Sequence, residues 1–239
     1  LRDALSVRAG GQTSCLLLTS AEVDRRLGVD GISQASDDER LRTLRMWLTD
    51  QERRHDVILM QTDSTVTEWT QRCIRSADEV MFVAQANADP LAGSVARQVQ
   101  AEELAHQTRR RKALVLVHPP ATEQPRGTVE WLHAFNLLKS ADDPRIPGRH
   151  FHIRTGDLDD YARLARYVNR REVGLVLSGR GARGFAHVGC IRAMQQLRIP
   201  IDMIAGVSMG SLVGAAYASQ GNRFEATIGD IRASLKRPQ

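Results

Sequence analysis

The stretch Gly206-Val-Ser-Met-Gly210 decides how this chain is interpreted. An apolar run, Ile201 to Ala205, precedes it, and residues 211–219, which follow it, are rich in small side chains. This order predicts a strand, a tight turn and a helix, which is the context of a nucleophile elbow with Ser208 at its tip. Glycine suits the flanking positions because side chains there would collide. The serine would lie at the start of a helix, where backbone N–H groups and the helix dipole favour developing negative charge.

A second glycine-rich loop lies upstream of the elbow. Residues Val173 to Leu177 form a strand candidate that leads directly into Ser178-Gly-Arg-Gly-Ala-Arg-Gly184. A helix is predicted after this loop, because apolar residues recur at three-residue steps along one face (Phe185, Val188, Ile191, Met194 and Leu197). Pro200 marks the boundary before the next strand. The region therefore contains two strand–loop–helix units in tandem.

The upstream loop fits two kinds of site. Gly179-x-Gly181-x-x-Gly184 between a strand and a helix is also the fingerprint of a dinucleotide-binding fold. That fold places an acidic residue at the carboxyl end of the next strand to bind the ribose, whereas Asp202 lies at the beginning of that strand here. Because the far end of the strand carries the serine elbow instead, we favour acyl transfer over dinucleotide binding.

In the acyl-transfer interpretation the two loops act together. Attack by Ser208 on an ester carbonyl creates an oxyanion, which backbone N–H groups of a neighbouring glycine-rich loop can stabilise. Arg183 would brace this loop or add positive charge; a salt bridge elsewhere or simple exposure to solvent is the competing interpretation. The predicted loop residues are Gly179, Arg180, Gly181, Arg183 and Gly184, and the elbow is shaped by Gly206 and Gly210.

Residues 1–171 predict a separate module, and residues 172–239 a second domain. In the first module, strand candidates alternate with helical stretches, which predicts an α/β fold with a Rossmann-like parallel sheet wrapped by helices. The strand candidates are Cys15–Leu18, Val57–Met60, Val80–Ala84, Ala113–Val117 and Phe151–Ile153. The helix candidates are Asp37–His55, Thr65–Ala77, Leu91–Arg111, Thr128–Leu138 and Leu158–Val168.

Few residues of the first module suggest chemistry. Asp63 follows a strand candidate at the edge where α/β proteins usually bind ligands, with capping of the next helix as the alternative. The run Gly10-Gly-Gln-Thr-Ser14 lacks the lysine and the spacing of a phosphate-binding P-loop. The histidines show no ligand spacing beyond the pair His150 and His152, so solvated or core histidines are expected. We predict a scaffold or regulatory module.

Composition sets further limits. The 239 residues suffice for one large or two modest domains, and the net charge of +5 comes mainly from arginine. The cluster Arg109–Lys112 is interpreted as the last turn of a helix, with a contact to anionic lipid as the alternative. The cysteines (Cys15, Cys73 and Cys190) are expected to be reduced, partly buried thiols. The chain shows no initiator methionine, signal peptide or membrane span, which predicts an internal fragment on the cytoplasmic side, soluble or peripherally membrane-associated.

Several motifs together resemble one enzyme family. The run Leu177-Ser-Gly-Arg-Gly-Ala-Arg-Gly-Phe-Ala-His-Val-Gly189, followed by Gly206-Val-Ser-Met-Gly210, is similar to the opening of a patatin-like phospholipase domain. Upstream, Trp47-Leu-Thr-Asp-Gln-Glu52, Gln61-Thr-Asp63 and Trp69-Thr-Gln-Arg-Cys-Ile-Arg-Ser-Ala-Asp78 resemble the segment before that domain in the neuropathy target esterase subgroup. The resemblance covers nearly the whole chain.

This resemblance implies a serine esterase that hydrolyses carboxylic ester bonds of phospholipids or lysophospholipids through a Ser–Asp dyad. Ser208 would be the nucleophile, residues 179–184 would form the oxyanion loop, and an aspartate would act directly on the serine hydroxyl as general base. No catalytic histidine is implied, so His187 is expected to be a packing residue of its helix. We expect lipid as the substrate, peripheral contact with a membrane, no cofactor, no metal ion and no nucleic acid.

The chain departs from the family pattern in two places. Arg180 stands where the family usually has glycine, so its side chain would cap or narrow the oxyanion hole. The family's aspartate lies in an Asp-Gly-Gly or Asp-Gly-Ala motif downstream of the serine, and residues 209–239 contain neither. Asp230 and Asp30 do not match this motif, so we expect a fragment with little turnover. A non-catalytic α/β module that binds an anion such as phosphate is the alternative.

Overall fold

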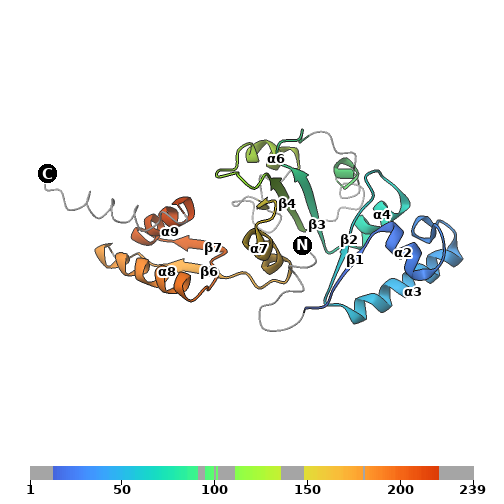
Figure 1. Cartoon of the computed structure of the whole chain (residues 1–239), viewed down its shortest axis with the longest axis horizontal. Helices are drawn as coiled ribbons and strands as arrows, with labels where there is room; N and C mark the ends of the chain where they lie inside the picture. The colour runs from blue at the N-terminus through green and yellow to red at the C-terminus, as the bar shows by residue number, and fades with distance from the viewer. Residues whose placement is uncertain are drawn as a thin grey trace. The chain divides into compact units, whose positions relative to one another are not determined.

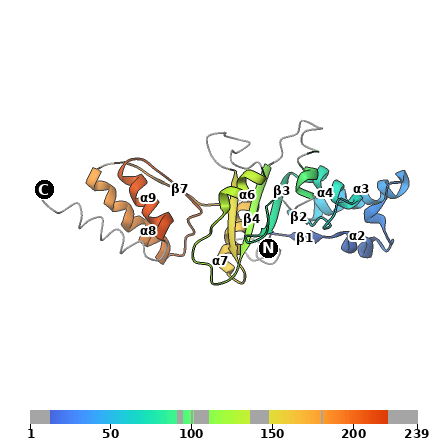
Figure 2. The same ribbon diagram turned by 90° about the horizontal axis from the view of Figure 1, so that it is seen from above.

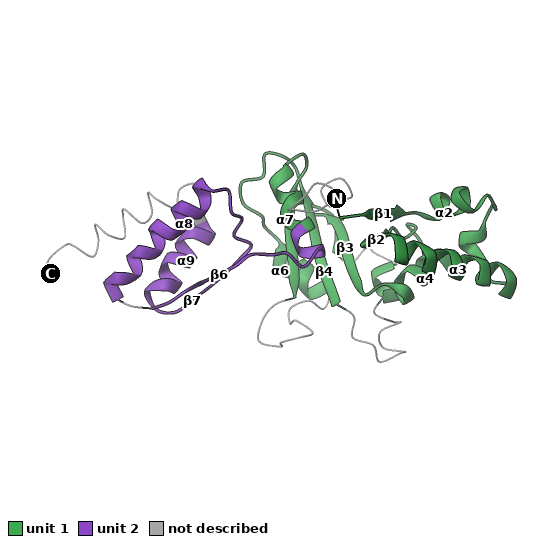
Figure 3. Cartoon of the chain, turned by 90° about the horizontal axis from the view of Figure 1, so that it is seen from below, with its two compact units in different colours: residues 1–165 green, residues 166–239 purple. Residues whose placement is uncertain are grey.

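The computed structural model describes residues 13–90, 95–99, 101, 111–135, 148–179 and 181–220. The chain divides into two compact units, residues 1–165 and 166–239 (Figure 3). Figure 1 labels the helices and strands of both units. All strand pairs in the described residues are parallel, so the expected α/β fold with parallel sheets is confirmed.

The first unit begins with a two-stranded sheet. Its strands, β1 (Cys15–Leu18) and β2 (Val57–Met60), pair in register from Cys15 opposite Val57 to Leu18 opposite Met60. The connection between them contains helix α2 (Ser20–Leu27), the 3-10 turn η1 (Ile32–Gln34) and helix α3 (Asp38–Arg54). Helix α4 (Glu68–Ser76) follows β2, and Figure 2 shows these helices beside the two strands.

Helix α3 illustrates why these residues adopt these elements. The Asp37 side chain caps its start by accepting a hydrogen bond from the Arg40 backbone N–H. Acidic residues in the first turn and arginines in the last turn complement the helix dipole. Leu44 and Leu48 lie four residues apart, so they share one face and pack into a core with the fully buried Trp69.

A three-stranded sheet forms the second part of the first unit. Its strands are β3 (Glu79–Gln85), β4 (Arg111–His118) and β5 (Arg149–Arg154), in the order β3-β4-β5. The central strand β4 buries the consecutive residues 113–116, as expected for a strand covered on both faces. Helices α6 (Thr128–Ala134) and α7 (Leu158–Val168) accompany this sheet. Its core packs Phe82, Leu114 and Leu116 against Trp131 and Phe135.

The second unit is a two-stranded parallel sheet with two helices. Strands β6 (Gly174–Leu177) and β7 (Met203–Gly206) pair in register, with Leu177 opposite Gly206. The 3-10 turn η2 (Gly181–Phe185) and helix α8 (Ala186–Gln196) lie between the strands, and α9 (Met209–Gln220) follows β7. The core contains Leu177, Ile191 and Val213. On the opposite face of β6, Val176 is 79% exposed.

Most element predictions agree with the structure, and the differences have physical causes. The helix expected over 65–77 begins at Glu68, because Thr67 is its N-cap and accepts a hydrogen bond from Thr70 N–H. Arg111 and Lys112 are the first residues of strand β4. The interpretation of Arg109–Lys112 as the last turn of a helix is therefore wrong at these two residues. Helix α2 was not predicted, and most of the long helix expected over 91–111 lies outside the described residues. In the part of the chain that is described, no helix could span a membrane.

Strand β7 begins two residues later than predicted because Asp202 is used as an anchor. Its carboxylate accepts hydrogen bonds from Arg166 Nη2 at 2.6 Å, from Arg166 Nε at 2.9 Å and from Val173 N–H at 3.0 Å. The Asp202 side chain is 1% exposed and that of Arg166 is 23% exposed. These contacts hold the amino ends of β6 and β7 together within the second unit. The Asp202 carboxylate therefore has a structural role. It lies before β7, whereas a ribose-binding acid would lie at the carboxyl end of that strand.

We expect the change Asp202→Ala to lower the free energy of unfolding by roughly 2–4 kcal/mol, because it leaves a largely buried guanidinium and a backbone N–H without their acceptor. Urea denaturation followed by circular dichroism measures this loss. The matched control is Asp50→Ala, which removes a pair with Arg54 in which both side chains are exposed, together with a long contact of 3.4 Å from Gln51 Nε2. The control should change stability by no more than about 0.5 kcal/mol. Equal effects of the two variants would contradict the anchoring role.

Candidate active site

Ser208 lies at the tip of a tight turn between β7 and α9. Strand β7 ends at Gly206 and helix α9 begins at Met209, so only two residues connect them. The backbone φ of Ser208 is +52°, in the left-handed region that non-glycine residues rarely occupy. The residue is exposed, and its carbonyl accepts hydrogen bonds from Ser211 N–H and Leu212 N–H in the first turn of α9. This strained, exposed serine on a strand–turn–helix connection has the geometry of a nucleophile elbow.

The elbow requires glycine because backbone segments meet there. A Cβ atom on Gly206 would lie 2.7 Å from the carbonyl of Gly210. A Cβ atom on Gly210 would collide with the carbonyl oxygen of Leu177 and lie 2.8 Å from that of Ser178. The helix that carries the serine therefore packs directly on the end of strand β6.

The glycine-rich loop lies against Ser208. A Cβ atom on Gly179 would be 2.8 Å from Ser208 Cβ and 2.8 Å from the Val207 carbonyl oxygen. Val207 N–H donates to the Leu177 carbonyl at 3.0 Å, which joins the two loops through the backbone. The structure thus brings together the predicted nucleophile and the first glycine of the predicted oxyanion loop.

The rest of that loop forms η2 and leads into helix α8. Gly181 begins η2, and Gly184 is buried where a Cβ atom would meet the Met209 side chain at 2.5 Å. Arg183 is exposed, and Arg180 lies outside the described residues. His187, expected as a packing residue, is half-buried and donates from Nε2 to the Ser178 carbonyl at 2.8 Å. The sequence did not predict this contact, because helix periodicity carries no information about hydrogen bonds from a helix to a neighbouring loop.

The described residues around Ser208, the predicted nucleophile, include no candidate general base. No hydrogen bond joins the Ser208 hydroxyl to another described residue. The acidic residues of the second unit that the structure describes, Glu172 and Asp202, lie before β6 and β7. Because these strands are parallel, both acids lie at the amino edge of the sheet and the elbow at the carboxyl edge.

Asp63, the other candidate ligand residue, is the centre of a closed hydrogen-bond network in the first unit. Its carboxylate accepts from Ser20 Oγ at 2.7 Å, from Thr67 Oγ1 at 2.6 Å and from Gln34 Nε2 at 3.1 Å. Burial raises the pKa of Asp63, but these hydrogen bonds together bring it below its ordinary value. The carboxylate thereby ties η1 and the starts of α2 and α4 together, and Thr67 in turn caps α4.

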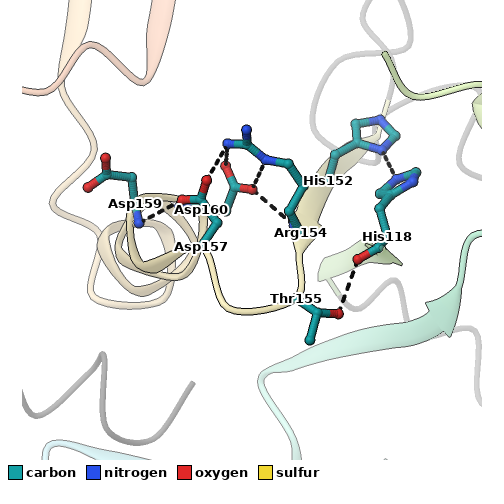
Figure 4. Close-up of polar contacts among 7 residues, drawn as sticks. All are labelled: His118, His152, Arg154, Thr155, Asp157, Asp159 and Asp160. Atoms are coloured by element: carbon teal, nitrogen blue, oxygen red, sulfur yellow. Dashed lines mark hydrogen bonds and ion pairs between the residues drawn. The ribbon is translucent and has the colours of Figure 1, made fainter. Parts of the chain in front are cut away.

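A histidine pair lies at the carboxyl end of β4 and β5 (Figure 4). His118 Nε2 and His152 Nδ1 are 2.9 Å apart, and His152 Nε2 is 3.4 Å from Thr128 Oγ1. Burial, with smaller contributions from His118 and His150, lowers the pKa of His152 from 6.5 to about 4. The hydrogen bond between the two histidines connects β4 to β5. No cluster of three metal-ligating side chains occurs among the described residues.

An ion-pair group follows the histidines on the chain. Arg154 pairs with Asp157 at 2.7 Å and with Asp160 at 2.8 Å, as Figure 4 shows. Hydrogen bonds from Arg154 lower the pKa of Asp160 despite its partial burial. These contacts fix the turn between β5 and α7 and leave the Asp160 carboxylate fully engaged.

The fold and the elbow define a class: a serine on a strand–turn–helix connection beside a glycine-rich loop is typical of α/β serine hydrolases. Residues 175–235 match the family described as "Patatin-like phospholipase". Residues 1–156 match the family described as "Neuropathy Target Esterase family P-loop like domain". The chain therefore belongs to the neuropathy target esterase subgroup of the patatin-like phospholipases, a family of lipid esterases.

Individual relatives agree with this assignment. The proteins named "Neuropathy target esterase sws" from Drosophila virilis and Drosophila melanogaster are each 38% identical to the chain over 224 residues. The alignments cover 87% of this chain and 15% of each relative, so the chain spans about a seventh of their length. No solved structure matches the chain.

The family description of residues 1–156 raises the question of whether the first unit fits a nucleotide phosphate. A P-loop is a glycine-rich connection of several residues between a strand and a helix. Here one residue, Thr19, separates β1 from α2, and its hydroxyl already accepts from Glu22 N–H. Ser20 is bonded to Asp63, and the acidic Glu22 lies in the first turn. The residues at this strand–helix junction do not fit a nucleotide phosphate.

His152 makes the stability of the first unit depend on pH. Its folded pKa of about 4 lies below the ordinary value of 6.5, so the unfolded chain binds more protons between these two values. We expect the free energy of unfolding to decrease as the pH falls from about 6.5 to about 5, above the range in which carboxylates titrate. Urea titrations followed by tryptophan fluorescence report on this unit, because Trp47, Trp69 and Trp131 all belong to it.

The control is the variant His152→Gln, which keeps a polar side chain but cannot take up a proton in this range. Its stability should vary less over the same pH interval. A slope equal to that of the parent chain would contradict the assignment of the effect to His152.

Proposed function

We propose that this chain supplies the nucleophile and the oxyanion loop of an esterase that hydrolyses carboxylic ester bonds of phospholipids or lysophospholipids. The observation that carries the proposal is the contact between the strained Ser208 and Gly179. The family membership supports the lipid class of substrate. Two apolar residues near the serine in the sequence, Val207 and Leu212, are 68% and 57% exposed, which suits an acyl chain.

The proposed reaction proceeds in two steps. Ser208 Oγ attacks the ester carbonyl carbon while its proton passes to a carboxylate, and the carbonyl oxygen gains the negative charge. N–H groups of the loop that begins at Gly179 stabilise this oxyanion, and the α9 N-terminus contributes a favourable dipole. As the intermediate collapses, the C–O bond to the leaving group breaks and the protonated carboxyl returns its proton to the departing oxygen, which releases the alcohol, such as a glycerophospho-alcohol, and leaves an acyl-serine. Water activated by the same carboxylate then hydrolyses the acyl-enzyme.

The carboxylate of this Ser–Asp dyad is not among the described acids near Ser208. Residues 209–239 also lack the Asp-Gly-Gly or Asp-Gly-Ala motif that the family resemblance implies. On this basis we propose that residues 1–239 alone have little turnover, and that a longer protein supplies the base. Binding to a membrane surface would bring the exposed Val207 and Leu212 to the lipid substrate.

In the full-length protein we expect Ser208→Ala to reduce hydrolysis of a lysophospholipid by at least about 10³-fold, because the acyl-enzyme can no longer form. Release of fatty acid measures the rate. Ser219→Ala in helix α9 is the matched control: among the described residues its hydroxyl bonds the Ala216 carbonyl, and its removal should leave the rate unchanged. Comparable rates for the Ser208→Ala variant and the parent protein would refute the assignment.

The 239-residue chain itself should react slowly or not at all with p-nitrophenyl esters, because removing one member of a catalytic pair costs several orders of magnitude. A fluorophosphonate probe on the full-length protein separates this proposal from a non-catalytic anion-binding module. Labelling at Ser208 supports the esterase, whereas phosphate binding without labelling supports the module. Rapid ester turnover by residues 1–239 would show that a base is already present in this chain.

A further inference from the structure

His187 holds the glycine loop at its first peptide bond. It is the second residue of α8, and its Nε2 lies 2.8 Å from the carbonyl oxygen of Ser178. A carbonyl oxygen can only accept a hydrogen bond, so the proton lies on Nε2. Both the neutral Nε2–H tautomer and the imidazolium satisfy this contact, which makes it insensitive to the protonation of the ring.

The contact controls the direction of a group beside the nucleophile. The structure contains no cis peptide bonds in its described residues, so the Ser178 carbonyl and the Gly179 N–H lie in one rigid plane and point in opposite directions. Fixing the carbonyl therefore fixes the N–H. Gly179 lies against Ser208, since a Cβ atom on this glycine would be 2.8 Å from Ser208 Cβ, so the N–H that is fixed belongs to the loop residue next to the serine.

We propose that His187 is a positioning residue for the oxyanion loop: by holding the Ser178–Gly179 peptide plane, it keeps the Gly179 N–H aligned with the oxyanion formed at Ser208. The inference rests on the esterase function proposed above. His187 is not the general base, because its Nε2 is engaged by Ser178 and no hydrogen bond joins it to Ser208 in the described residues. The role is one of orientation, and it acts through the loop.

The test compares His187→Leu with His187→Gln in the full-length protein. Leucine removes the donor, whereas the glutamine amide nitrogen can take the place of Nε2. Misaligned oxyanion donors reduce the chemical step, so we expect kcat of the leucine variant for a soluble ester to fall about 10- to 100-fold with little change in KM. The glutamine variant should recover most of kcat. His133→Leu, at an exposed histidine of α6, controls for the loss of an imidazole and should have no effect.

Hydrogen–deuterium exchange of a peptide that covers residues 178–184 gives a readout that does not depend on turnover. We expect faster exchange in the leucine variant and near-parental exchange in the glutamine variant. An unchanged kcat and unchanged exchange in the leucine variant would overturn the positioning role. A parallel Ser208→Ala variant keeps the two proposals apart: if it retains activity, the esterase assignment fails, and if it is inactive while His187→Leu is fully active, only the positioning role fails.

Discussion

The second unit depends on a close approach between two parallel strand ends that only glycine permits. Leu177 and Gly206 are paired at the carboxyl ends of β6 and β7, and the chain leaves both strands through a glycine-containing turn. Gly210 brings the first turn of α9 onto the end of β6, and Gly179 brings the upstream loop onto Ser208. A side chain at either position would push the nucleophile and the oxyanion loop apart. The packing of α9 on β6 and the position of Ser208 beside the upstream loop therefore both depend on glycine at these two positions.

The first unit uses polar residues in a different way. Its Asp63 network, its histidine pair and its Arg154 ion pairs all lie where α/β proteins usually bind ligands, at the carboxyl ends of strands. In each case the polar side chains form hydrogen bonds or ion pairs with one another. Such networks contribute to local order because each member is held by several partners, and they leave few groups for a ligand. Ser208 of the second unit differs, because it is exposed and no hydrogen bond joins its hydroxyl to another described residue. For this reason we propose the catalytic site in the second unit.

Much of this organisation could be predicted from the sequence, for reasons that differ between elements. Strands β1 and β2 and helix α7 were predicted with the observed bounds, because apolar runs and helical periodicity mark them clearly. The elbow followed from the glycine spacing around Ser208, which the required backbone contacts now explain. Helix α2 was missed because its eight residues are mostly polar and bury only Val23. Cys190, expected to be partly buried, is exposed, whereas Cys73 is buried and its pKa is raised to about 12.

Contacts between side chains distant in the sequence could not be predicted in this way. The pairs Arg166–Asp202 and His187–Ser178 depend on how helices pack on strand ends, and periodicity carries no information about them. The Asp202 pair also bears on the mechanism, because it commits an acid of the second unit to the amino edge of the sheet. A carboxylate that is held there by an arginine and a backbone N–H cannot reach a serine at the opposite edge. The base of the proposed dyad must therefore come from an element that passes over the carboxyl ends of β6 and β7, close to the loop that His187 holds.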